Sequence, residues 1–383
     1  MADTVHDYIY LDHNATTPIA REVAEAMAPY IAERFGNPSS NHSLGREARE
    51  GVEKAREEVA SLIGARPDNI IFTSGGTESN NMVLKGVVDF RSPEQTHIIT
   101  CAVEHPAILN PCIYLMELGV NVSIVAVDRY GRVEPDEIKK AIRPDTKLIS
   151  IMLANNETGT LQPVGEICSI AREHGVPVHT DAAQAVGKIE VNVDELGIDF
   201  LSIAGHKLYG PKGIGALYVR DPKAIRPLIH GASQEKGLRP GTENVILSVG
   251  LGAACKLCSL RLRADMAAMA EYRNRLQGLL FSNLDGLVLN GHPEQRLPNT
   301  LNVSVPGVEG VRVLAGVPRV MASTGAACHG DGVKVSHVLS AMGVPEEIAI
   351  GALRLTVGRS NTIEQIEEAA ELLVERIKEL RNA

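Results

Sequence analysis

Lys207 is the side chain in this sequence best placed to serve as a covalent attachment point. It lies in the segment 205–213, GHKLYGPKG, directly after the apolar run 200–203. A lysine just past a strand end, flanked by turn-forming Gly and Pro, is suited to the crevice at the carboxyl edge of a parallel sheet. Its amine, when partly neutral, can form an imine with a carbonyl cofactor. Taken alone, the segment is better explained by a solvated loop lysine, and the motifs below reverse that preference.

Two other segments could bind the ends of such a cofactor. Residues 74–80, SGGTESN, join the apolar run 69–73 to a predicted helix, where backbone N–H groups and the hydroxyl of Thr77 could hold a phosphate. Asp181 directly follows the run 177–180. Its carboxylate could pair with a protonated pyridine nitrogen, and this pairing makes the ring an electron sink. The alternatives are an ordinary capped turn for the first segment and a helix N-cap for Asp181.

A histidine and an asparagine pair complete the set. His105 follows the run 97–103 and could move protons near neutral pH, although an isolated histidine is more often a satisfied loop residue. Asn155 and Asn156 follow the run 147–153, and a side-chain amide there could reach a ring substituent. Because the carboxyl ends of parallel strands meet at one edge of a sheet, we predict that all five segments form one site.

The elements that must position these residues are seven apolar runs. In most of them the apolar residues follow one another without alternating polar residues. This pattern is typical of strands buried on both faces, in a sheet covered by helices. Helical spacing lies between several of them, as at 134–142 and 163–173. The sequence therefore predicts an α/β fold with a mainly parallel seven-stranded sheet, whose strands are residues 69–73, 97–103, 121–127, 147–153, 177–180, 200–203 and 215–219.

The pattern changes after about residue 260. Residues 264–281 have the spacing of a long helix, 296–305 that of a strand, and 362–380 that of an amphipathic helix with many charges. These elements predict a smaller α+β domain. We assign residues 18–262 to the large domain and residues 1–17 and 263–383 to the small one.

Composition excludes several classes of function. The chain has 383 residues, 44% of them hydrophobic, and a net charge of -9 from 38 basic and 47 acidic residues, which argues against a nucleic-acid surface. The start of the sequence lacks the basic and apolar pattern of a secretory signal, and no apolar run approaches the roughly 18 residues of a membrane helix. We therefore expect a cytoplasmic protein with no membrane and no nucleic-acid partner.

The six cysteines are spread along the chain, which favours free thiols over a disulfide framework. Cys255 and Cys258 form one CxxC pair in the apolar stretch 245–263, without a second ligand pair nearby. We predict thiols packed inside a helix and no metal site.

In combination the motifs resemble the cysteine desulfurases of the NifS/IscS type, within the class V aminotransferase group of fold-type I enzymes that use pyridoxal phosphate (PLP). The resemblance runs almost from end to end. It rests on YLDHNATTP (10–18), GNPSS (36–40), TSGGTESNN (73–81), NNE (155–157), HTD (179–181), GHK (205–207), RPGTEN (239–244) and RLPNT (296–300). It implies a homodimer that converts L-cysteine to L-alanine and passes the sulfur to a protein acceptor such as an iron–sulfur scaffold.

The resemblance also implies roles for individual residues. Lys207 would carry PLP, His105 would stack on its ring and Asp181 would bind the ring nitrogen. Arg354 would clamp the substrate carboxylate, with a guanidinium fork suited to that planar group, and Asn37 would assist. The remaining cofactor contacts would be Asn156 and Gln184 near the ring oxygen, Gly76, Thr77 and His206 at the phosphate, and Thr242 reaching the phosphate from the partner subunit.

Cys328 is the expected sulfur acceptor. It lies in the segment 325–332, GAACHGDG, whose glycines would let a loop swing between the cofactor and an acceptor protein. A thiolate there could attack the substrate sulfur, leaving alanine and an enzyme persulfide. The alternative is an inert loop thiol.

Two features depart from the desulfurase pattern. Ala204 stands where the family usually has a hydroxyl residue, so one phosphate contact is expected to be missing. Segments 205–211 and 321–332 look more like those of selenocysteine lyases, whereas Pro106 replaces the acidic residue that animal lyases tend to carry after the histidine. A selenocysteine lyase is therefore the alternative enzyme. A non-catalytic scaffold protein is the alternative outside enzymes, and the intact Lys207 argues against it.

Overall fold

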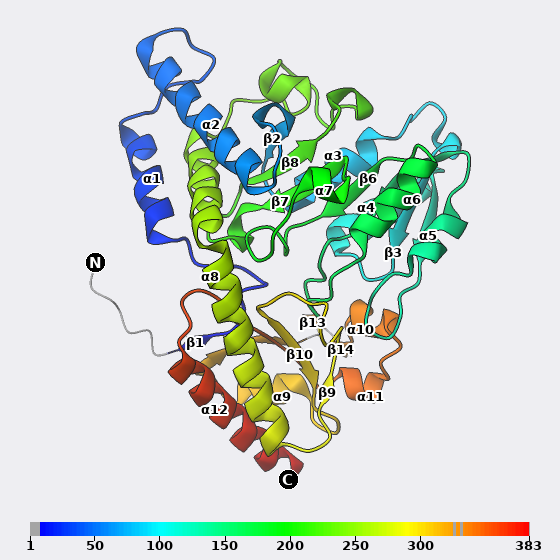
Figure 1. Cartoon of the computed structure of the whole chain (residues 1–383), viewed down its shortest axis with the longest axis vertical. Helices are drawn as coiled ribbons and strands as arrows, with labels where there is room; N and C mark the ends of the chain where they lie inside the picture. The colour runs from blue at the N-terminus through cyan, green and yellow to red at the C-terminus, as the bar shows by residue number, and fades with distance from the viewer. Residues whose placement is uncertain (1–7, 325–326, 330–331, 383) are drawn as a thin grey trace.

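The protein has a large α/β layer structure above a smaller α+β unit (Figure 1). The computed structural model describes residues 8–324, 327–329 and 332–382, and for residues 327–329 and 332–334 it describes the backbone alone. Both units have their own cluster of buried apolar side chains. The fold class predicted from the sequence is confirmed.

The seven apolar runs form one sheet in the order β2-β8-β7-β6-β5-β3-β4. Pairing is parallel from β7 through to β4, and β8 runs against both of its neighbours. Every residue of β3, β6 and β7 is buried, in agreement with continuous apolar runs covered on both faces. The strands are β2 (Ile70–Thr73), β3 (His97–Cys101), β4 (Asn121–Val125), β5 (Thr146–Ser150), β6 (Val178–Asp181), β7 (Phe200–Ala204) and β8 (Gly215–Val219).

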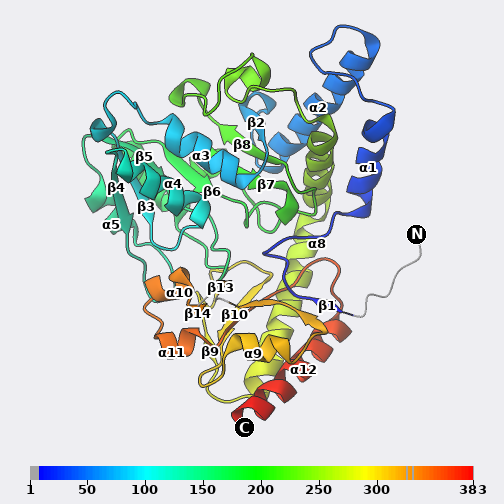
Figure 2. The ribbon, with the colours of Figure 1, turned by 180° about the vertical axis from the view of Figure 1, so that it is seen from behind.

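Helices pack on both sides of this sheet, as the front and rear views show (Figures 1 and 2). Those before residue 200 are α1 (Arg21–Ala32), α2 (Ser43–Leu62), α3 (Gly76–Gly86), α4 (Pro106–Glu117), α5 (Pro135–Ala141), α6 (Val164–Glu173) and α7 (Val193–Leu196). Several begin directly after a strand, so their N-termini lie at the carboxyl edge of the sheet. This edge is where the predicted site residues lie.

One helix joins the two units. α8 (Val245–Asn283) covers both stretches that the sequence suggested as separate helices, and it passes residues 262 and 263 without a break (Figure 1). It packs against α1, α2 and α12 (Ile363–Arg381). Cys255 and Cys258 are buried in it, as predicted for packed helix thiols. The domain boundary proposed at residue 262 stays a prediction.

α8 corrects one expectation from the sequence. It contains an 18-residue window with a mean hydropathy of 1.6, of which 39% is buried, so by length and composition it could cross a membrane. The core helix of a soluble protein passes the same test, and α8 packs along much of its length against other helices. The window is weak support for a membrane span.

The smaller unit is built on a four-stranded sheet in the order β12-β15-β10-β9. Its strands are β9 (Val288–Leu289), β10 (Thr300–Ser304), β12 (Ser323–Thr324) and β15 (Ala352–Thr356), and β1 (Ile9–Tyr10) pairs beside it with β11 (Val320–Met321). Helices α9 (Gly310–Ala315), α10 (His337–Ala341) and α11 (Glu346–Ala349) complete the unit, with α12 beginning at a capping box on Thr362. The N-terminal strand thus belongs with the C-terminal third of the chain.

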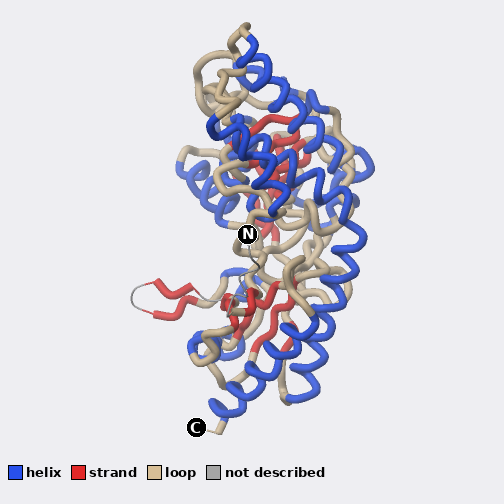
Figure 3. Tube along the Cα trace, turned by 90° about the vertical axis from the view of Figure 1, so that its left-hand side faces the viewer, coloured by secondary structure: helices blue, strands red, loops and turns tan. Residues whose placement is uncertain are grey.

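A two-stranded ribbon follows β12. Its strands, β13 (Ala327–His329) and β14 (Gly332–Lys334), pair in antiparallel register with Cys328 opposite Val333. The ribbon stands out from the rest of the molecule in the side view (Figure 3). The side chain of Cys328 lies outside the described residues.

Candidate active site

A cavity of about 380 Å³ lies at the carboxyl edge of the large sheet, where it faces the smaller unit. It is lined by residues that follow β2, β3, β5, β6 and β7 in the sequence. This is expected because the carboxyl ends of parallel strands meet at one edge of a sheet. Most of the predicted site residues line it: Gly76, Thr77, His105, Asn156, Asp181, Gln184, His206, Lys207 and Arg354.

Lys207 occupies a short 3₁₀ turn after β7, and its amine points into this cavity. Its Nζ donates to the backbone carbonyls of Asn14, at 2.5 Å, and Ala15, at 2.7 Å. Burial lowers the pKa of Lys207 to about 8, and the positive charge of Arg354 acts in the same direction. A substantial fraction of this amine is therefore neutral near physiological pH, as a nucleophile toward a carbonyl group must be.

Asp181 ends β6 and is 8% exposed. Its Oδ2 accepts a hydrogen bond from Asn80 Nδ2 at 2.7 Å, and its Oδ1 accepts one from the backbone N–H of Ala183 at 3.0 Å. The residues after it form turns, and the next helix, α7, begins only at Val193, so Asp181 is not a helix N-cap. A buried carboxylate with neutral donors alone is well suited to a cationic ring N–H.

His105 is the N-cap of α4, and its Nδ1 accepts the backbone N–H of Ala107 at 3.1 Å. In the neutral imidazole the proton is therefore on Nε2. Burial lowers the pKa of His105, Asp181 acts against this shift, and Lys207 supports it. The ring is thus largely neutral at physiological pH, with one N–H donor.

The N-terminus of α3 forms the opposite end of the cavity. Gly75 has φ +152°, a backbone conformation that favours glycine, and the helix begins directly after it at Gly76. Gly76 and Thr77 line the cavity together with Ala204 and His206. Burial, aided by nearby lysines, lowers the pKa of His206 to about 4, so its ring is neutral. Helix N–H groups and neutral donors here suit a phosphate.

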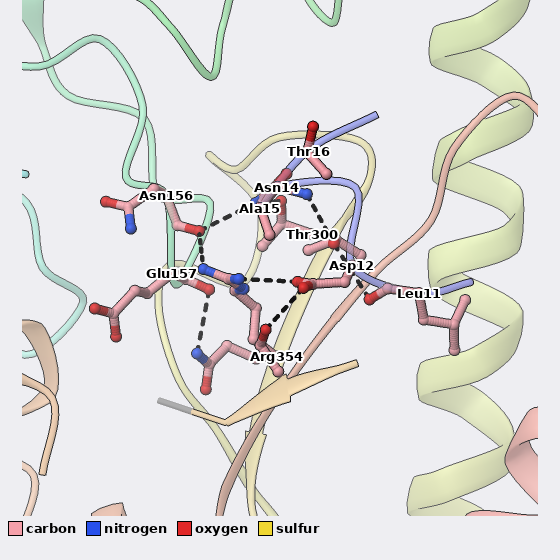
Figure 4. Close-up of polar contacts among 12 residues, drawn as sticks. Leu11, Asp12, Asn14, Ala15, Thr16, Asn156, Glu157, Thr300 and Arg354 are labelled. Carbon is pink, nitrogen blue, oxygen red and sulfur yellow. Dashed lines mark hydrogen bonds and ion pairs between the residues drawn. The ribbon is translucent and has the colours of Figure 1, made fainter. Parts of the chain in front are cut away.

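Arg354 lies on β15 and lines the cavity, and neighbouring residues hold its guanidinium in place (Figure 4). Its Nη2 pairs with Asp12 Oδ1 at 2.9 Å, and its Nη1 makes a long contact of 3.4 Å with the carbonyl of Asn156. Nε is buried and has no hydrogen-bond partner in the described part of the chain. Asp12 in turn accepts a hydrogen bond from Ser323 Oγ at 2.9 Å. The guanidinium therefore retains donors for a planar anion.

Two predicted residues are not brought into this cavity, and the side chain of a third is not described. Asn37 is exposed, and its Oδ1 accepts the backbone N–H of Ser39 at 2.9 Å. Thr242 is also exposed and lies away from the cavity of its own chain, so its contact across a subunit interface stays a prediction. Cys328 lies in β13, and its side chain is outside the described residues.

Sequence reasoning missed the residue at the centre of the polar contacts. Asn14 donates through Nδ2 to Thr300 Oγ1 at 2.9 Å (Figure 4). Its carbonyl accepts from both Lys207 and Gln184. It belongs to the motif 10–18 but follows a two-residue strand of the smaller unit, where the strand-end argument does not apply. Lys188, buried beneath Gln184, was missed because its sequence context resembles that of any surface lysine.

The cavity fits PLP by the chemistry of its donors. Around one space lie an amine of lowered pKa, a buried carboxylate, a glycine-led helix N-terminus and a guanidinium. Among the described side chains the carboxylate has no ion-pair partner and the guanidinium has an unpaired Nε. These groups match the aldehyde, ring nitrogen and phosphate of that cofactor and the carboxylate of an amino-acid substrate.

Comparison with known proteins gives the same assignment. The model of the family Aminotransferase class-V matches residues 9–368. A relative from Dictyoglomus turgidum, "Cysteine desulfurase IscS", is 50% identical over 97% of this chain and 95% of its own length. The solved structure of a NifS-like protein has a TM-score of 0.91 at 39% identity, covering 97% of this chain and 99% of that one. Another, "SspA in complex with cysteine", has a TM-score of 0.81 at 37% identity, covering 92% and 99%. With this cavity and these relatives, the chain belongs to the class-V aminotransferase family, among its NifS/IscS-type cysteine desulfurases.

Proposed function

We propose that this protein is a PLP-dependent cysteine desulfurase, which converts L-cysteine to L-alanine and transfers the sulfur to Cys328. The observation that carries the proposal is the buried amine of Lys207, with a pKa of about 8, in one cavity with Asp181 and Arg354. The family membership and the relatives' names support the same reaction.

Bound PLP would supply an electron sink that stabilises negative charge at the substrate Cα. Lys207 would hold the cofactor and move a proton at Cα, and the carboxylate of Asp181 would keep the ring nitrogen protonated. Arg354 would bind the substrate carboxylate and so fix which Cα bond faces the ring. His105 is placed by α4 with Nε2 as its proton-bearing atom, and so can donate a hydrogen bond beside the ring.

Sulfur transfer would use the Cys328 thiolate as nucleophile. It attacks the substrate sulfur, the bond between that sulfur and the substrate Cβ breaks, and the electron pair stays on the carbon. The carbon takes a proton and becomes the methyl group of alanine, while the sulfur remains on Cys328 as a persulfide. No external oxidant is needed. The position of Cys328 on a ribbon that stands out from the body favours delivery to another protein (Figure 3).

The finer parts of the proposal concern partners and location. The enzyme would act as a homodimer in the cytoplasm, with Thr242 completing the phosphate site of its partner and Asn37 assisting at the substrate carboxylate. The sulfur acceptor would be a protein such as an iron–sulfur scaffold.

A single turnover with L-cysteine tests the proposal. The PLP-loaded enzyme is mixed with one equivalent of substrate, thiols are alkylated, and peptides are analysed by mass spectrometry. We expect one added sulfur atom on Cys328 and one alanine per site, with none on the other five cysteines, which are buried and act as an internal control. Alanine formation at the wild-type rate by Cys328→Ala would refute the proposed acceptor.

A selenocysteine lyase remains the alternative because of the segments 205–211 and 321–332. Turnover of L-selenocysteine and L-cysteine is compared in the wild type and in Cys328→Ala. Retained selenocysteine activity with lost cysteine activity would indicate use of both substrates, whereas loss of both would favour the desulfurase alone.

A further inference from the structure

Lys188 is a buried lysine that the proposed reaction does not use. It lies between β6 and α7 and is 4% exposed. Gly187 before it has φ +78°, and a Cβ there would come within 2.9 Å of Cys258 Sγ, so this turn packs tightly against α8. The Lys188 side chain therefore has little room to leave the interior.

The contacts of Lys188 are those of an uncharged amine. Its Nζ donates to Gln184 Oε1 at 2.6 Å and to Asn14 Oδ1 at 3.1 Å, and it makes no ion pair in the described part of the chain. A neutral amine has two N–H donors, and two acceptors are present. A charged ammonium would have a third donor and a buried charge, both without a partner.

Most surroundings of Lys188 disfavour its charged form. Burial lowers the pKa of Lys188 well below its ordinary value, the positive charges of Lys207 and Arg354 act in the same direction, and Cys258 acts against them. The two nearby histidines, His13 and His206, have lowered pKa values and are neutral at physiological pH.

The two hydrogen bonds fix groups that touch the cofactor lysine. Because Gln184 Oε1 accepts from Lys188, the NH₂ end of that amide is turned to Asn14, and Nε2 donates to the Asn14 carbonyl at 2.9 Å. The same carbonyl accepts Lys207 Nζ at 2.5 Å. Gln184 also lines the cavity and keeps a second N–H on Nε2.

We propose that Lys188 is a positioning residue, an uncharged amine that orients the amide of Gln184 toward the cofactor cavity and holds the Asn14 peptide against Lys207. This inference rests on the proposed roles of Lys207 and Gln184. An N–H of Gln184 facing the phenolic oxygen of bound PLP stabilises its anionic form, so loss of this orientation favours protonation. Lys188→Met removes the donors and keeps the apolar stem.

The first test is a pH titration of the absorption spectrum of the PLP-loaded protein without substrate. For Lys188→Met we expect the midpoint to rise by about one pH unit, the size of a lost hydrogen bond to a charged oxygen. The control is Lys147→Met, the same change at an exposed lysine on β5. Equal midpoints for the two variants and the wild type would overturn the proposal.

A double-variant comparison tests whether Lys188 acts through Gln184. In a Gln184→Leu background, Lys188→Met should add no further shift of the midpoint. An added shift as large as that of the single variant would refute the link. If Lys188→Met does not fold, Lys188→Gln replaces it because it keeps uncharged N–H donors. A midpoint nearer to wild type than to Gln184→Leu then supports the role, and one equal to Gln184→Leu refutes it.

A measurement on the apo-protein tests the uncharged state without any cofactor. A lysine with a lowered folded pKa binds fewer protons when folded, so its contribution to stability rises with pH until the unfolded pKa of about 10.4 is passed. The denaturant midpoint of Lys188→Met should therefore rise less between pH 7 and 10 than that of the wild type or Lys147→Met. An unchanged slope would show a charged Lys188. Failure of the proposed function itself would differ, since wild type would then have no pH-dependent PLP band at Lys207.

Discussion

Replacing Asp12 by alanine should weaken substrate binding without directly touching the reacting atoms. Asp12 holds Nη2 of Arg354 at 2.9 Å, and the two side chains are 19% and 13% exposed (Figure 4). A hydrogen bond between charged groups contributes about 1.5–3 kcal/mol. Among the residues whose side chains are described, Arg354 then keeps only the long contact with the Asn156 carbonyl and an unpartnered Nε, so little else there fixes its head group.

We take the lower end of that range because both side chains are partly reached by water. A loss of about 1.4 kcal/mol corresponds to a tenfold weaker interaction with the substrate carboxylate. Asp12→Ala should therefore raise the KM for L-cysteine roughly tenfold, while kcat changes less, because the interaction is made to the bound substrate before and during reaction alike.

The assay is alanine formation over a range of L-cysteine concentrations, with the PLP spectrum recorded first to establish equal loading. Ser323→Ala is the matched control, since it removes the other partner of Asp12 and leaves the ion pair in place. We expect a KM close to wild type for this variant. An Asp12→Ala enzyme with unchanged KM, or one in which kcat alone falls, would contradict the view that Asp12 holds the carboxylate-binding arginine.

Three further predictions concern cofactor uptake and stability. Because the pKa of Lys207 is lowered to about 8, uptake of PLP by the apo-protein should accelerate roughly tenfold from pH 7 to 9 and then level off; a continued rise would indicate an ordinary lysine. Ala204→Ser places a hydroxyl beside Gly76 at the phosphate end, and should slow PLP release about five- to tenfold in a competition assay; equal release would show that no contact is missing. Glu235→Ala removes the carboxylate that binds the buried Arg56 at 2.7 Å and leaves it the more exposed Glu53 at 3.2 Å, so it should cost about 3 kcal/mol in denaturant unfolding, whereas Glu25→Ala at an exposed pair should cost less than about 0.5.

The sequence predicted those parts of the molecule that follow from local pattern. The strands β3, β6 and β7 were recognisable because every residue in them is buried, and the residues after them converge because parallel strands end at one edge. The continuity of α8 was not predictable in this way, because helical spacing in two adjoining segments does not show whether the helix breaks between them.

Two residues of the site, Asn14 and Lys188, could not be found from the sequence because their contacts are long-range. Asn14 follows a two-residue strand of the smaller unit, and its contacts with Lys207 and Thr300 are nearly 200 and 300 residues away in the chain. Lys188 is buried beside a turn at which Gly187 packs against α8. Such long-range contacts leave no periodic pattern in the sequence, and tertiary structure alone reveals them.

The central claim is that one amine, Lys207, carries the cofactor. The most direct measurement is borohydride reduction of the PLP-loaded protein, followed by mass spectrometry of its peptides. We predict a phosphopyridoxyl group on Lys207, and none on Lys212, the lysine nearest to it in the sequence, or on the buried Lys188. A reduced protein with the group on another lysine, or with no trapped cofactor at all, would contradict the account.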